Sequence, residues 1–201
     1  MFTSAHPIVL GSGSPRRREM LLQLGLSLEV VAPDVNEDHA ENETPEAYIR
    51  AVVLRKIHRT LELCAASGLN FSAILCADTV VVLDEHILQK PVDSADAGRM
   101  LSSLLGQKHQ VLTGYALWVP GKSIAKERVV ATEVTFRHGS SQELNAYVES
   151  GEGLDKAGGY AVQGCGAAFV ERISGSYTNV VGLPLCELTL DLLELGVIAA
   201  N

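Results

Sequence analysis

The chain has 201 residues, of which 47% are hydrophobic and 20% charged, so it can bury one sizeable core and we expect a single globular domain over residues 1–201. Its formal net charge of −8 at pH 7 argues against a general nucleic-acid binder, because such proteins offer a basic surface to phosphates. No run approaches the roughly 18 apolar residues of a membrane span, and residues 1–7 lack the basic segment of a signal peptide. We therefore expect a cytoplasmic protein whose partners include neither nucleic acid nor a membrane.

The first half of the chain alternates strand and helix patterns. A short loop of glycine and serine follows the first strand, and Ser14 at the N-cap with Pro15 at the first helical position marks the start of a helix. The valine-rich run 73–83 predicts a strand that is covered on both faces and interrupted by Asp78-Thr79. The expected elements are strands over 8–10, 28–32 and 73–83 and helices over 15–24 and 45–67.

The second half of the chain contains a predicted hairpin. Alternating patterns over 110–119 and 128–137 flank the turn residues Pro120-Gly121. A hairpin beside buried strands indicates an α/β fold with a mixed sheet. The other expected elements are a helix over 95–105 capped by Ser94, a helix after a capping box at 140–143, a glycine-rich segment over 151–166, a strand near 169–173 and a helix from 184 to 196.

The four cysteines lie far apart in the sequence, without the C-x-x-C pairs of a zinc site or the regular spacing of a disulfide framework. We therefore expect reduced, partly buried thiols. They are Cys64, Cys76, Cys165 and Cys186.

The segment 11–18, with the sequence GSGSPRRR, predicts an anion site. A strand, a tight loop and a helix N-terminus aim backbone N–H groups at one point, and the guanidinium groups of Arg16 and Arg17 match phosphate oxygens. Both arginines lie unfavourably near the positive end of the helix dipole unless an anion compensates them. A dinucleotide fingerprint is excluded because it needs glycine at Arg16, and a P-loop because it ends in G-K-[ST]. The alternative is an exposed first turn with solvated arginines.

Asp78 is a second candidate, because a carboxylate within an apolar strand is costly to bury unless it meets a cation, a metal ion or several donors. A position at a strand end, beside a ligand at the edge of the sheet, satisfies this need. The alternative is a strand terminus with Asp78 in solvent and a new strand after it. Glu37, Lys56 and Lys90 add the carboxylate and the cations that a phosphoryl-transfer site needs, although most such residues are solvated surface.

The glycine-rich stretch 155–164, DKAGGYAVQG, is a third candidate. Its paired glycines let the backbone approach a ligand closely, and Gln163 offers both a donor and an acceptor to the edge of a base. The alternative is a bulged strand with turns.

Taken in order, these motifs resemble those of the Maf family of nucleotide pyrophosphatases. They span residues 8–185, nearly the whole chain, and the ordered set is specific although each motif alone is not. The matching segments are SGSPRR at 12–17, ADTVV at 77–81, KP at 90–91, the segment 106–114 with His109 and Thr113, DKAG at 155–158, GSY at 175–177 and NVVGLP at 179–184.

The resemblance implies an elongated mixed β-sheet flanked by helices, with two lobes and a deep cleft, similar to the inosine triphosphate pyrophosphatases. It implies that a nucleoside triphosphate is hydrolysed between the α and β phosphates, with Mg²⁺, Mn²⁺ or Co²⁺ as cofactor, by an enzyme that is often a homodimer. Asp78 is the implied proton acceptor, Glu37, Lys56 and Lys90 are the other implied catalytic groups, and Glu37 and Asp78 are the implied metal ligands. The implied substrate-binding residues are Gly13, Ser14, Arg16, Arg17, Thr79, Asp155, Lys156 and Gln163.

Three of these positions also imply the substrate. The subgroup that acts on dTTP and UTP has arginine, threonine and glutamine at the positions of Arg16, Thr79 and Gln163. The subgroup that cleaves 7-methyl-GTP has tryptophan, glutamine and glutamate there. The chain therefore resembles the pyrimidine subgroup. Two alternatives stay open: a 7-methyl-GTP pyrophosphatase, and a nucleotide-binding regulator of cell division or septum formation.

Overall fold

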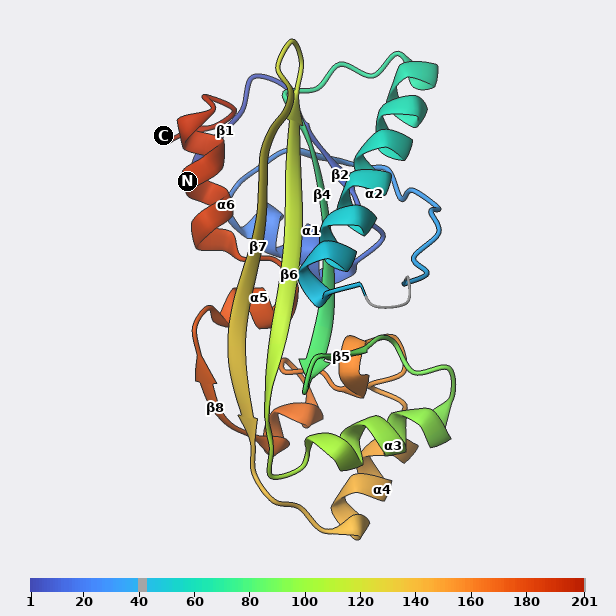
Figure 1. Ribbon diagram of the computed structural model, residues 1–201. Coiled ribbons are helices and arrows are strands. Elements are labelled where there is room, and N and C mark those ends of the chain that lie inside the picture. The colour runs from blue at the N-terminus through green and yellow to red at the C-terminus, as the bar shows by residue number, and fades with distance from the viewer. Residues whose placement is uncertain (40–42, 201) are drawn as a thin grey trace. The chain divides into compact units, whose positions relative to one another are not determined.

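The computed structural model describes residues 1–39 and 43–200 (Figure 1). Its strands are β1 (Phe2–Thr3), β2 (Ile8–Gly11), β3 (Leu28–Val30), β4 (Ala73–Leu83), β5 (His86–Leu88), β6 (Lys108–Val119), β7 (Ser123–Phe136), β8 (Val170–Ser174) and β9 (Ala199–Ala200). Its helices are α1 (Pro15–Gln23), α2 (Pro45–Ser67), α3 (Ser94–Leu104), α4 (Ser141–Glu149), α5 (Tyr177–Val181) and α6 (Leu185–Glu194), together with the 3₁₀ helices η1 (Ala157–Gly159) and η2 (Cys165–Phe169).

Seven of the described strands form one mixed sheet. Six of them follow the order β3-β2-β4-β6-β7-β8, and β5 pairs with β4 beside this path. Strand β2 is parallel to both β3 and β4, whereas the pairs β4–β5 and β7–β8 are antiparallel. The remaining pair, β1 with β9, brings the two ends of the chain together. The predicted α/β class with a mixed sheet is confirmed, and the predicted cleft between two lobes stays a prediction.

The chain folds as two compact units, each formed from more than one segment. Unit 1 comprises Met1–Asp78, Thr113–Val129 and Gly182–Asn201, and unit 2 comprises Thr79–Leu112 and Val130–Val181. Strands β4, β6 and β7 each pass from one unit into the other along the chain. The expected single domain over 1–201 stays a prediction.

In unit 1, helix α2 packs against the parallel strands. The Thr44 side chain caps α2 by accepting a hydrogen bond from the Ala47 N–H at 3.2 Å, and Gly68 ends the helix with a φ of 65°. Each aliphatic side chain that becomes fully buried contributes roughly 1.5–3 kcal/mol, so this packing fixes α2 firmly on the sheet. The apolar cluster that α2 shares with the strands comprises Val9, Val53, Ile57, Cys64, Ile74, Cys76 and Ala116.

In unit 2, helices α3 and α4 contact each other, and the core is rich in aromatic residues. The predicted capping box of α4 is present: the Glu143 N–H donates to Ser140 Oγ at 3.2 Å, and the Ser140 N–H donates to the Glu143 carboxylate at 2.7 Å. The core cluster comprises Val81, Leu101, Leu104, Val111, Val134, Phe136, Tyr147, Tyr160 and Phe169.

The structure corrects several local predictions. Strand β4 is not interrupted at Asp78-Thr79, because Ala77 and Val80 on either side are buried in the sheet and hold the backbone extended. Helix α3 is capped by Asp93 rather than by the following serine, since the Asp93 carboxylate accepts a hydrogen bond from the Asp96 N–H at 2.7 Å.

The glycine-rich segment 151–166 is not a bulged strand. It forms turns and short 3₁₀ helices, because Gly151, Gly158 and Gly159 all have positive φ values that an extended strand excludes. Strand β7 begins at Ser123 rather than at residue 128, and the short elements β1, β5, β9 and α5 were not predicted.

Two other expectations concern the chain as a whole. Within residues 1–39 and 43–200, no helix combines the length and the apolar character needed to cross a bilayer. All four cysteines are free thiols as predicted; Cys64 and Cys76 are buried, and Cys165 and Cys186 are exposed.

Candidate functional site

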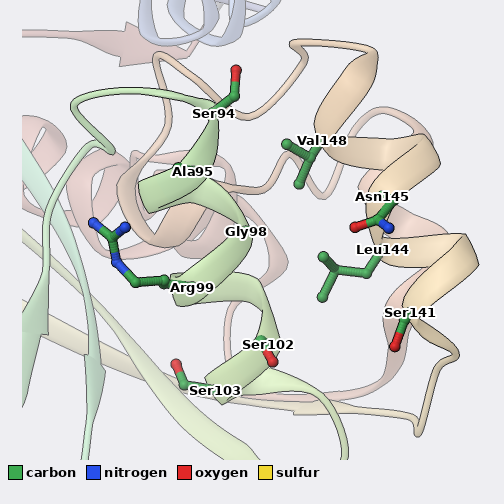
Figure 2. Close-up of a pocket in the computed structure, with 10 residues that line it drawn as sticks. All are labelled: Ser94, Ala95, Gly98, Arg99, Ser102, Ser103, Ser141, Leu144, Asn145 and Val148. Carbon is green, nitrogen blue, oxygen red and sulfur yellow. The ribbon is translucent and has the colours of Figure 1, made fainter.

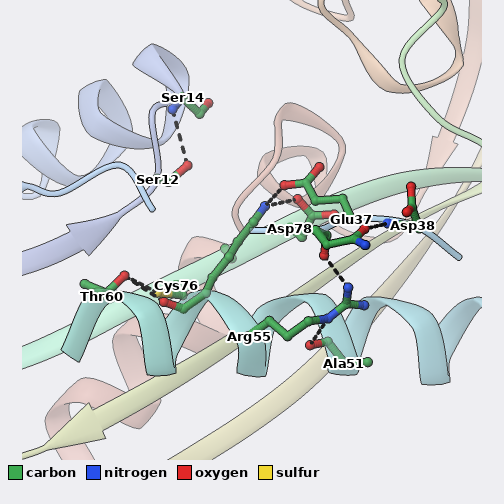
Figure 3. Close-up of polar contacts among 12 residues, drawn as sticks. Ser12, Ser14, Glu37, Asp38, Ala51, Arg55, Thr60, Cys76 and Asp78 are labelled. Carbon is green, nitrogen blue, oxygen red and sulfur yellow. Dashed lines mark hydrogen bonds and ion pairs between the residues drawn. The ribbon is translucent and has the colours of Figure 1, made fainter. Parts of the chain in front are cut away.

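Lys56 of α2 joins two carboxylates from different parts of unit 1. Its Nζ lies 2.7 Å from Asp78 Oδ1 on β4 and 2.7 Å from Glu37 Oε1 in the loop before α2. Figure 3 shows the Glu37 and Asp78 side chains beside each other over α2. The Lys56 and Asp78 side chains are only 10% and 14% exposed, so water screens their mutual attraction weakly. Three of the four predicted catalytic residues therefore form one cluster, which we call the charged centre.

The loop that carries Glu37 is attached to α2 by two further contacts. The Tyr48 hydroxyl donates a hydrogen bond to the Glu37 carbonyl oxygen at 2.8 Å, and the Arg55 guanidinium donates to the Asn36 carbonyl oxygen. Tyr48 lies two turns before Arg55, on the same face of α2. Neither residue was predicted from the sequence, although two polar side chains spaced seven residues apart on a predicted helix indicate a shared polar face.

Asp78 owes its position to the end of the strand beside it. Strand β2 runs parallel to β4 as far as the pair of Gly11 with Cys76, and the chain then leaves β2 at Ser12. The Asp78 carboxylate therefore lies just beyond the end of β2, although β4 itself continues to Leu83. The prediction that Asp78 ends its own strand is wrong, because the strand that ends here is the neighbour.

Gly11 permits helix α2 to approach this point of the sheet. A Cβ atom on Gly11 would lie 2.3 Å from Cys76 Sγ and 2.6 Å from Thr60 Oγ1. Thr60 lies one turn after Lys56, and its hydroxyl donates to the Lys56 carbonyl oxygen at 2.7 Å. A larger residue than glycine would displace α2 and move the Lys56 ammonium group away from Asp78.

Arg17 is buried, with 7% of the residue exposed, and it binds three residues that lie far apart in the sequence of unit 1. Its Nε donates to the Gly182 carbonyl oxygen at 2.8 Å, and its Nη1 donates to Ser12 Oγ and to the Ala77 carbonyl oxygen, each at 2.9 Å. Burial lowers the pKa of Arg17 and Asp78 acts against this shift. The alternative of a merely solvated Arg17 is wrong, and its predicted contact with phosphate stays a prediction.

The rest of the predicted phosphate loop surrounds Ser12. Gly13 is exposed, and Ser14 and Arg16 are half-buried. Ser14 occupies the N-cap of α1 as predicted but makes no side-chain capping bond; its N–H donates to Ser12 Oγ at 3.2 Å. Ser12 thus accepts hydrogen bonds both from the loop and from Arg17. Ser12 was part of the sequence motif, yet this role in shaping the loop was not predicted.

Three predicted residues of unit 2 lie near one backbone contact. The Gly158 N–H donates to the Gln89 carbonyl oxygen at 3.1 Å, which places Lys90 next to the DKAG segment. Within that segment the Lys156 ammonium group contacts the Asp155 carboxylate. Lys90 and Asp155 are exposed, as residues that meet a ligand must be.

The remaining predicted residues of unit 2 are Thr79 and Gln163. Thr79 follows Asp78 on β4 and is half-buried, and Gln163 is exposed in the turn before η2. The structure therefore forms the charged centre within unit 1 and the glycine-rich segment within unit 2. The prediction that residues of both units bind one substrate stays a prediction.

His109 and Tyr160 form a buried polar pair in unit 2. His109 is 2% exposed, its Nε2 lies 2.8 Å from the Tyr160 hydroxyl oxygen, and its ring packs edge-on against Phe136. Burial lowers the pKa of His109 to about 4, so the ring is neutral near pH 7. His109 thus anchors the glycine-rich segment through Tyr160 without carrying a charge.

The charged centre offers two ligands to a divalent cation. Glu37 and Asp78 contact one ammonium nitrogen, so a single cation can reach both carboxylates. Among residues 1–39 and 43–200 there is no group of three or more His, Cys, Asp and Glu side chains suited to a metal ion. Two carboxylates nevertheless fit Mg²⁺, which is commonly bound by one or two carboxylates together with water and substrate phosphates.

Unit 2 also contains a hollow of about 740 Å³ (Figure 2). It lies between α3 and α4, and its lining includes Ser94, Arg99, Ser141 and Leu144. None of its lining residues belongs to the predicted site, so it contributes nothing to the candidate function.

Comparison with known proteins identifies the family. The family model described as Maf-like protein matches residues 7–195. The chain is 48% identical to a dTTP/UTP pyrophosphatase of Vibrio cholerae over 90% of this chain and 93% of the relative. It is 44% identical to a dTTP/UTP pyrophosphatase of Geobacter metallireducens, covering 94% of this chain and 96% of the relative. It is 42% identical to a dTTP/UTP pyrophosphatase of Desulfotalea psychrophila, covering 99% of this chain and 100% of the relative.

Among solved structures, the Staphylococcus aureus Ham1 protein is 16% identical, with a TM-score of 0.47 and coverage of 94% of this chain and 98% of that chain. The family itself rests on the sequence relatives, which span nearly the whole chain, and on the match over residues 7–195. The chain belongs to the Maf family.

Proposed function

We propose that this protein is a nucleoside triphosphate pyrophosphatase that converts dTTP and UTP to the monophosphate and pyrophosphate. The observation that carries the proposal is the charged centre, in which one buried lysine holds two carboxylates, while Arg17 of the predicted phosphate loop binds the carbonyl oxygen of Ala77, next to Asp78. Relatives at 42–48% identity that bear the name dTTP/UTP pyrophosphatase support the substrate class.

Asp78 is the proposed general base. It accepts a proton from a water molecule whose oxygen attacks the α-phosphorus, and the bond from that phosphorus to the bridging oxygen breaks. Pyrophosphate leaves with the bonding electron pair. Lys56, at 2.7 Å from Asp78 Oδ1, orients the carboxylate, while its second partner, Glu37, holds the lysine in place.

The cationic side chains stabilise the negative charge that shifts to the leaving group. Arg16, Arg17, the Gly13 amide and the Ser14 hydroxyl are proposed to bind the phosphates, together with Lys90 and Lys156. Glu37 and Asp78 would hold a divalent cation, which neutralises triphosphate charge when bound. Mg²⁺, Mn²⁺ and Co²⁺ are the candidates.

The nucleobase of the substrate is proposed to contact Thr79 and Gln163. Asp155 is proposed as a further polar group, from the same glycine-rich segment as Gln163. Gln163 is exposed, and its amide can pair with the mixed donor and acceptor edge of uracil or thymine. A cytoplasmic location, expected from the composition of the sequence, and a homodimer, implied by the family resemblance, complete the proposal.

The test is an assay of products. Purified protein is incubated with MgCl₂ and with dTTP, UTP, CTP or 7-methyl-GTP, and monophosphate, diphosphate, pyrophosphate and phosphate are separated by ion-exchange chromatography. We expect equal amounts of monophosphate and pyrophosphate from dTTP and UTP. Diphosphate with free phosphate would place the cleavage at the wrong bond, and binding without turnover would favour a nucleotide-binding regulator.

A further inference from the structure

The glycine-rich segment of unit 2 folds around two side chains at the end of α4. The Glu152 carboxylate accepts hydrogen bonds from the Cys165 N–H at 2.9 Å and from the Gly166 N–H at 3.0 Å. The Tyr147 hydroxyl accepts one from the Ala161 N–H at 3.1 Å. We call this arrangement of Tyr147 and Glu152 the clasp, since it holds both ends of the turn over residues 161–166.

The turn lies so close to the clasp that two of its positions have no room for a Cβ atom. A Cβ atom on Gly164 would lie 2.0 Å from Glu152 Oε1, and one on Gly166 would lie 2.9 Å from the Tyr147 hydroxyl oxygen. Neither glycine has a positive φ, so backbone strain does not explain these glycines. Glycine is needed at these two positions because the turn approaches the clasp so closely.

Both members of the clasp are in the protonation states that the hydrogen bonds need. Desolvation raises the pKa of Glu152, but the Gly166 and Cys165 N–H groups and the Tyr147 hydroxyl outweigh it and lower the pKa below its usual value. Burial raises the pKa of Tyr147, so its hydroxyl keeps its proton. The ionised carboxylate therefore offers two acceptor oxygens to two backbone donors.

Gln163 lies between the two points that the clasp holds. Ala161 is tied to Tyr147 on one side of it and Cys165 to Glu152 on the other, while Gln163 itself is exposed. The backbone around Gln163 is thus fixed on both sides. Its side chain is presented from an ordered turn, which is what selection among similar bases requires.

We propose that Glu152, with Tyr147, is a positioning residue that fixes the turn around Gln163 and thereby sets the preference for uracil and thymine over cytosine. This inference rests on the proposed function, because it takes Gln163 to contact the base. Uridine and cytidine triphosphates have the same phosphates and sugar and differ at the pairing edge of the ring, so their comparison isolates what the turn contributes.

Two variants disturb the clasp from opposite sides. Glu152→Gln keeps the shape but turns an N–H₂ group toward a backbone N–H, so one of the two hydrogen bonds is lost. Gly164→Ala changes no charge and places a methyl group against the Glu152 carboxylate. Glu149→Gln is the matched control, because Glu149 is exposed at the end of α4, three residues before Glu152, and loses the same charge.

Two measurements decide the inference. The first is kcat/KM for UTP and for CTP, at enzyme concentrations high enough to follow slow CTP turnover. We expect the UTP to CTP ratio to fall at least about fivefold in Glu152→Gln and Gly164→Ala and to stay within about twofold in Glu149→Gln. The second is hydrogen exchange of the Cys165 and Gly166 amides, expected to accelerate at least about tenfold in Glu152→Gln.

The possible outcomes separate this inference from the function on which it rests. A merely structural role would reduce UTP and CTP turnover in proportion and leave their ratio unchanged, which would overturn the inference while the function stands. Unchanged exchange at Cys165 and Gly166 would overturn it as well. A wild-type protein that hydrolyses neither nucleotide would overturn the proposed function, and the selectivity role of Glu152 would fall with it.

Discussion

The charged centre of unit 1 and the glycine-rich segment of unit 2 are held by different forces. In the charged centre, charged side chains bind one another: Lys56 bridges Glu37 and Asp78. In the glycine-rich segment, side chains bind backbone N–H groups, as Glu152 does with Cys165 and Gly166. Charges that need a defined position are fixed by ion pairs, whereas a turn that needs a defined shape is fixed through its amides.

This difference indicates how each region responds to mutation. Removing a charge from the charged centre should change the chemistry directly, because the groups held by these ion pairs are those we propose to take part in the reaction. Removing a contact from the turn changes shape first and selectivity second. Variants in unit 1 should therefore alter turnover or stability strongly, and variants in unit 2 should alter pH response and substrate preference.

The largest expected effect is that of Asp78→Asn on turnover. The amide keeps the shape of the carboxylate but cannot accept the proton of the attacking water, and loss of a general base typically costs about 10²–10⁴ in rate. Lys56 retains Glu37 as a partner, so the variant should fold and still bind dTTP. Steady-state kinetics give kcat, and calorimetry gives the dissociation constant.

Asp38→Asn is the control for this prediction, since Asp38 is an exposed acid next to Glu37 and loses the same charge. We expect it to stay near the wild-type kcat. Retention of more than about a tenth of the wild-type kcat in Asp78→Asn, a loss below about 1.4 kcal/mol, would show that Asp78 is not the essential base.

The next effect is on stability and concerns Arg17→Ala. The change leaves Ser12 Oγ and the carbonyl oxygens of Ala77 and Gly182 without a donor that they now have. Hydrogen bonds to charged groups contribute about 1.5–3 kcal/mol each and are not additive, so we expect the free energy of unfolding to fall by about 3–4 kcal/mol. Urea unfolding measures it, with exposed Arg18→Ala as the control. A loss below about 1 kcal/mol would show that the three hydrogen bonds of Arg17 do not stabilise unit 1 appreciably.

In unit 2 the expected effect appears as a pH dependence. His109 is buried and neutral, with a pKa of about 4, while an unfolded histidine has a pKa of about 6.5. The unfolded state therefore binds more protons than the folded state between pH 6.5 and 4. The free energy of unfolding is highest above pH 6.5 and falls by about 3 kcal/mol in total as the pH is lowered towards 4.

The His109→Gln variant removes this dependence, because an amide can still bond to Tyr160 but takes up no proton. We expect the stability advantage of wild type over the variant to shrink as the pH falls from 6.5 to 4 in urea unfolding. Exposed His86→Gln should leave the wild-type slope in place. Parallel curves for wild type and His109→Gln would contradict the prediction.

The regular elements that position both regions could be predicted from sequence because their signals are local. Thr44-Pro45 and Gly68 mark the two ends of α2, and the alternating patterns on either side of Pro120-Gly121 mark the β6–β7 hairpin. Charged residues could also be singled out, since Asp78 stands alone in an apolar run. These inferences need only neighbours in the chain.

Contacts over long sequence separations could not be predicted. Asp78 was expected to end its strand, yet the strand that ends beside it is β2, which is known only once β2 and β4 pair. Arg17 was expected to face solvent or phosphate, and its bond to Gly182 depends on a residue 165 positions away. The clasp at Glu152 was missed for a different reason. Its partners are backbone N–H groups, and nearly every residue has one, so the sequence does not indicate which of them Glu152 binds.

The smallest expected effect is on substrate preference, which rests on the residues at positions 16 and 163. A tryptophan at position 16 can stack on the cationic ring of 7-methylguanine, and a glutamate at position 163 can accept from its N–H groups. Arg16 would instead repel that positive ring, and neutral Gln163 suits the mixed edge of uracil or thymine. A site built on polar pairing rejects the wrong base because mismatched groups are left without partners.

We therefore expect kcat/KM for dTTP and UTP to exceed that for 7-methyl-GTP at least about tenfold, a difference of about 1.4 kcal/mol. The double change Arg16→Trp with Gln163→Glu should narrow this ratio, because it supplies the stacking surface and the acceptor that the purine needs. Gln142→Glu serves as the control, since Gln142 is exposed on α4 outside the predicted site and gains the same charge as Gln163→Glu. A wild-type preference for 7-methyl-GTP would refute the assignment to the pyrimidine subgroup. It would leave the proposed release of pyrophosphate standing, because the role proposed for the charged centre concerns the phosphates and not the nucleobase.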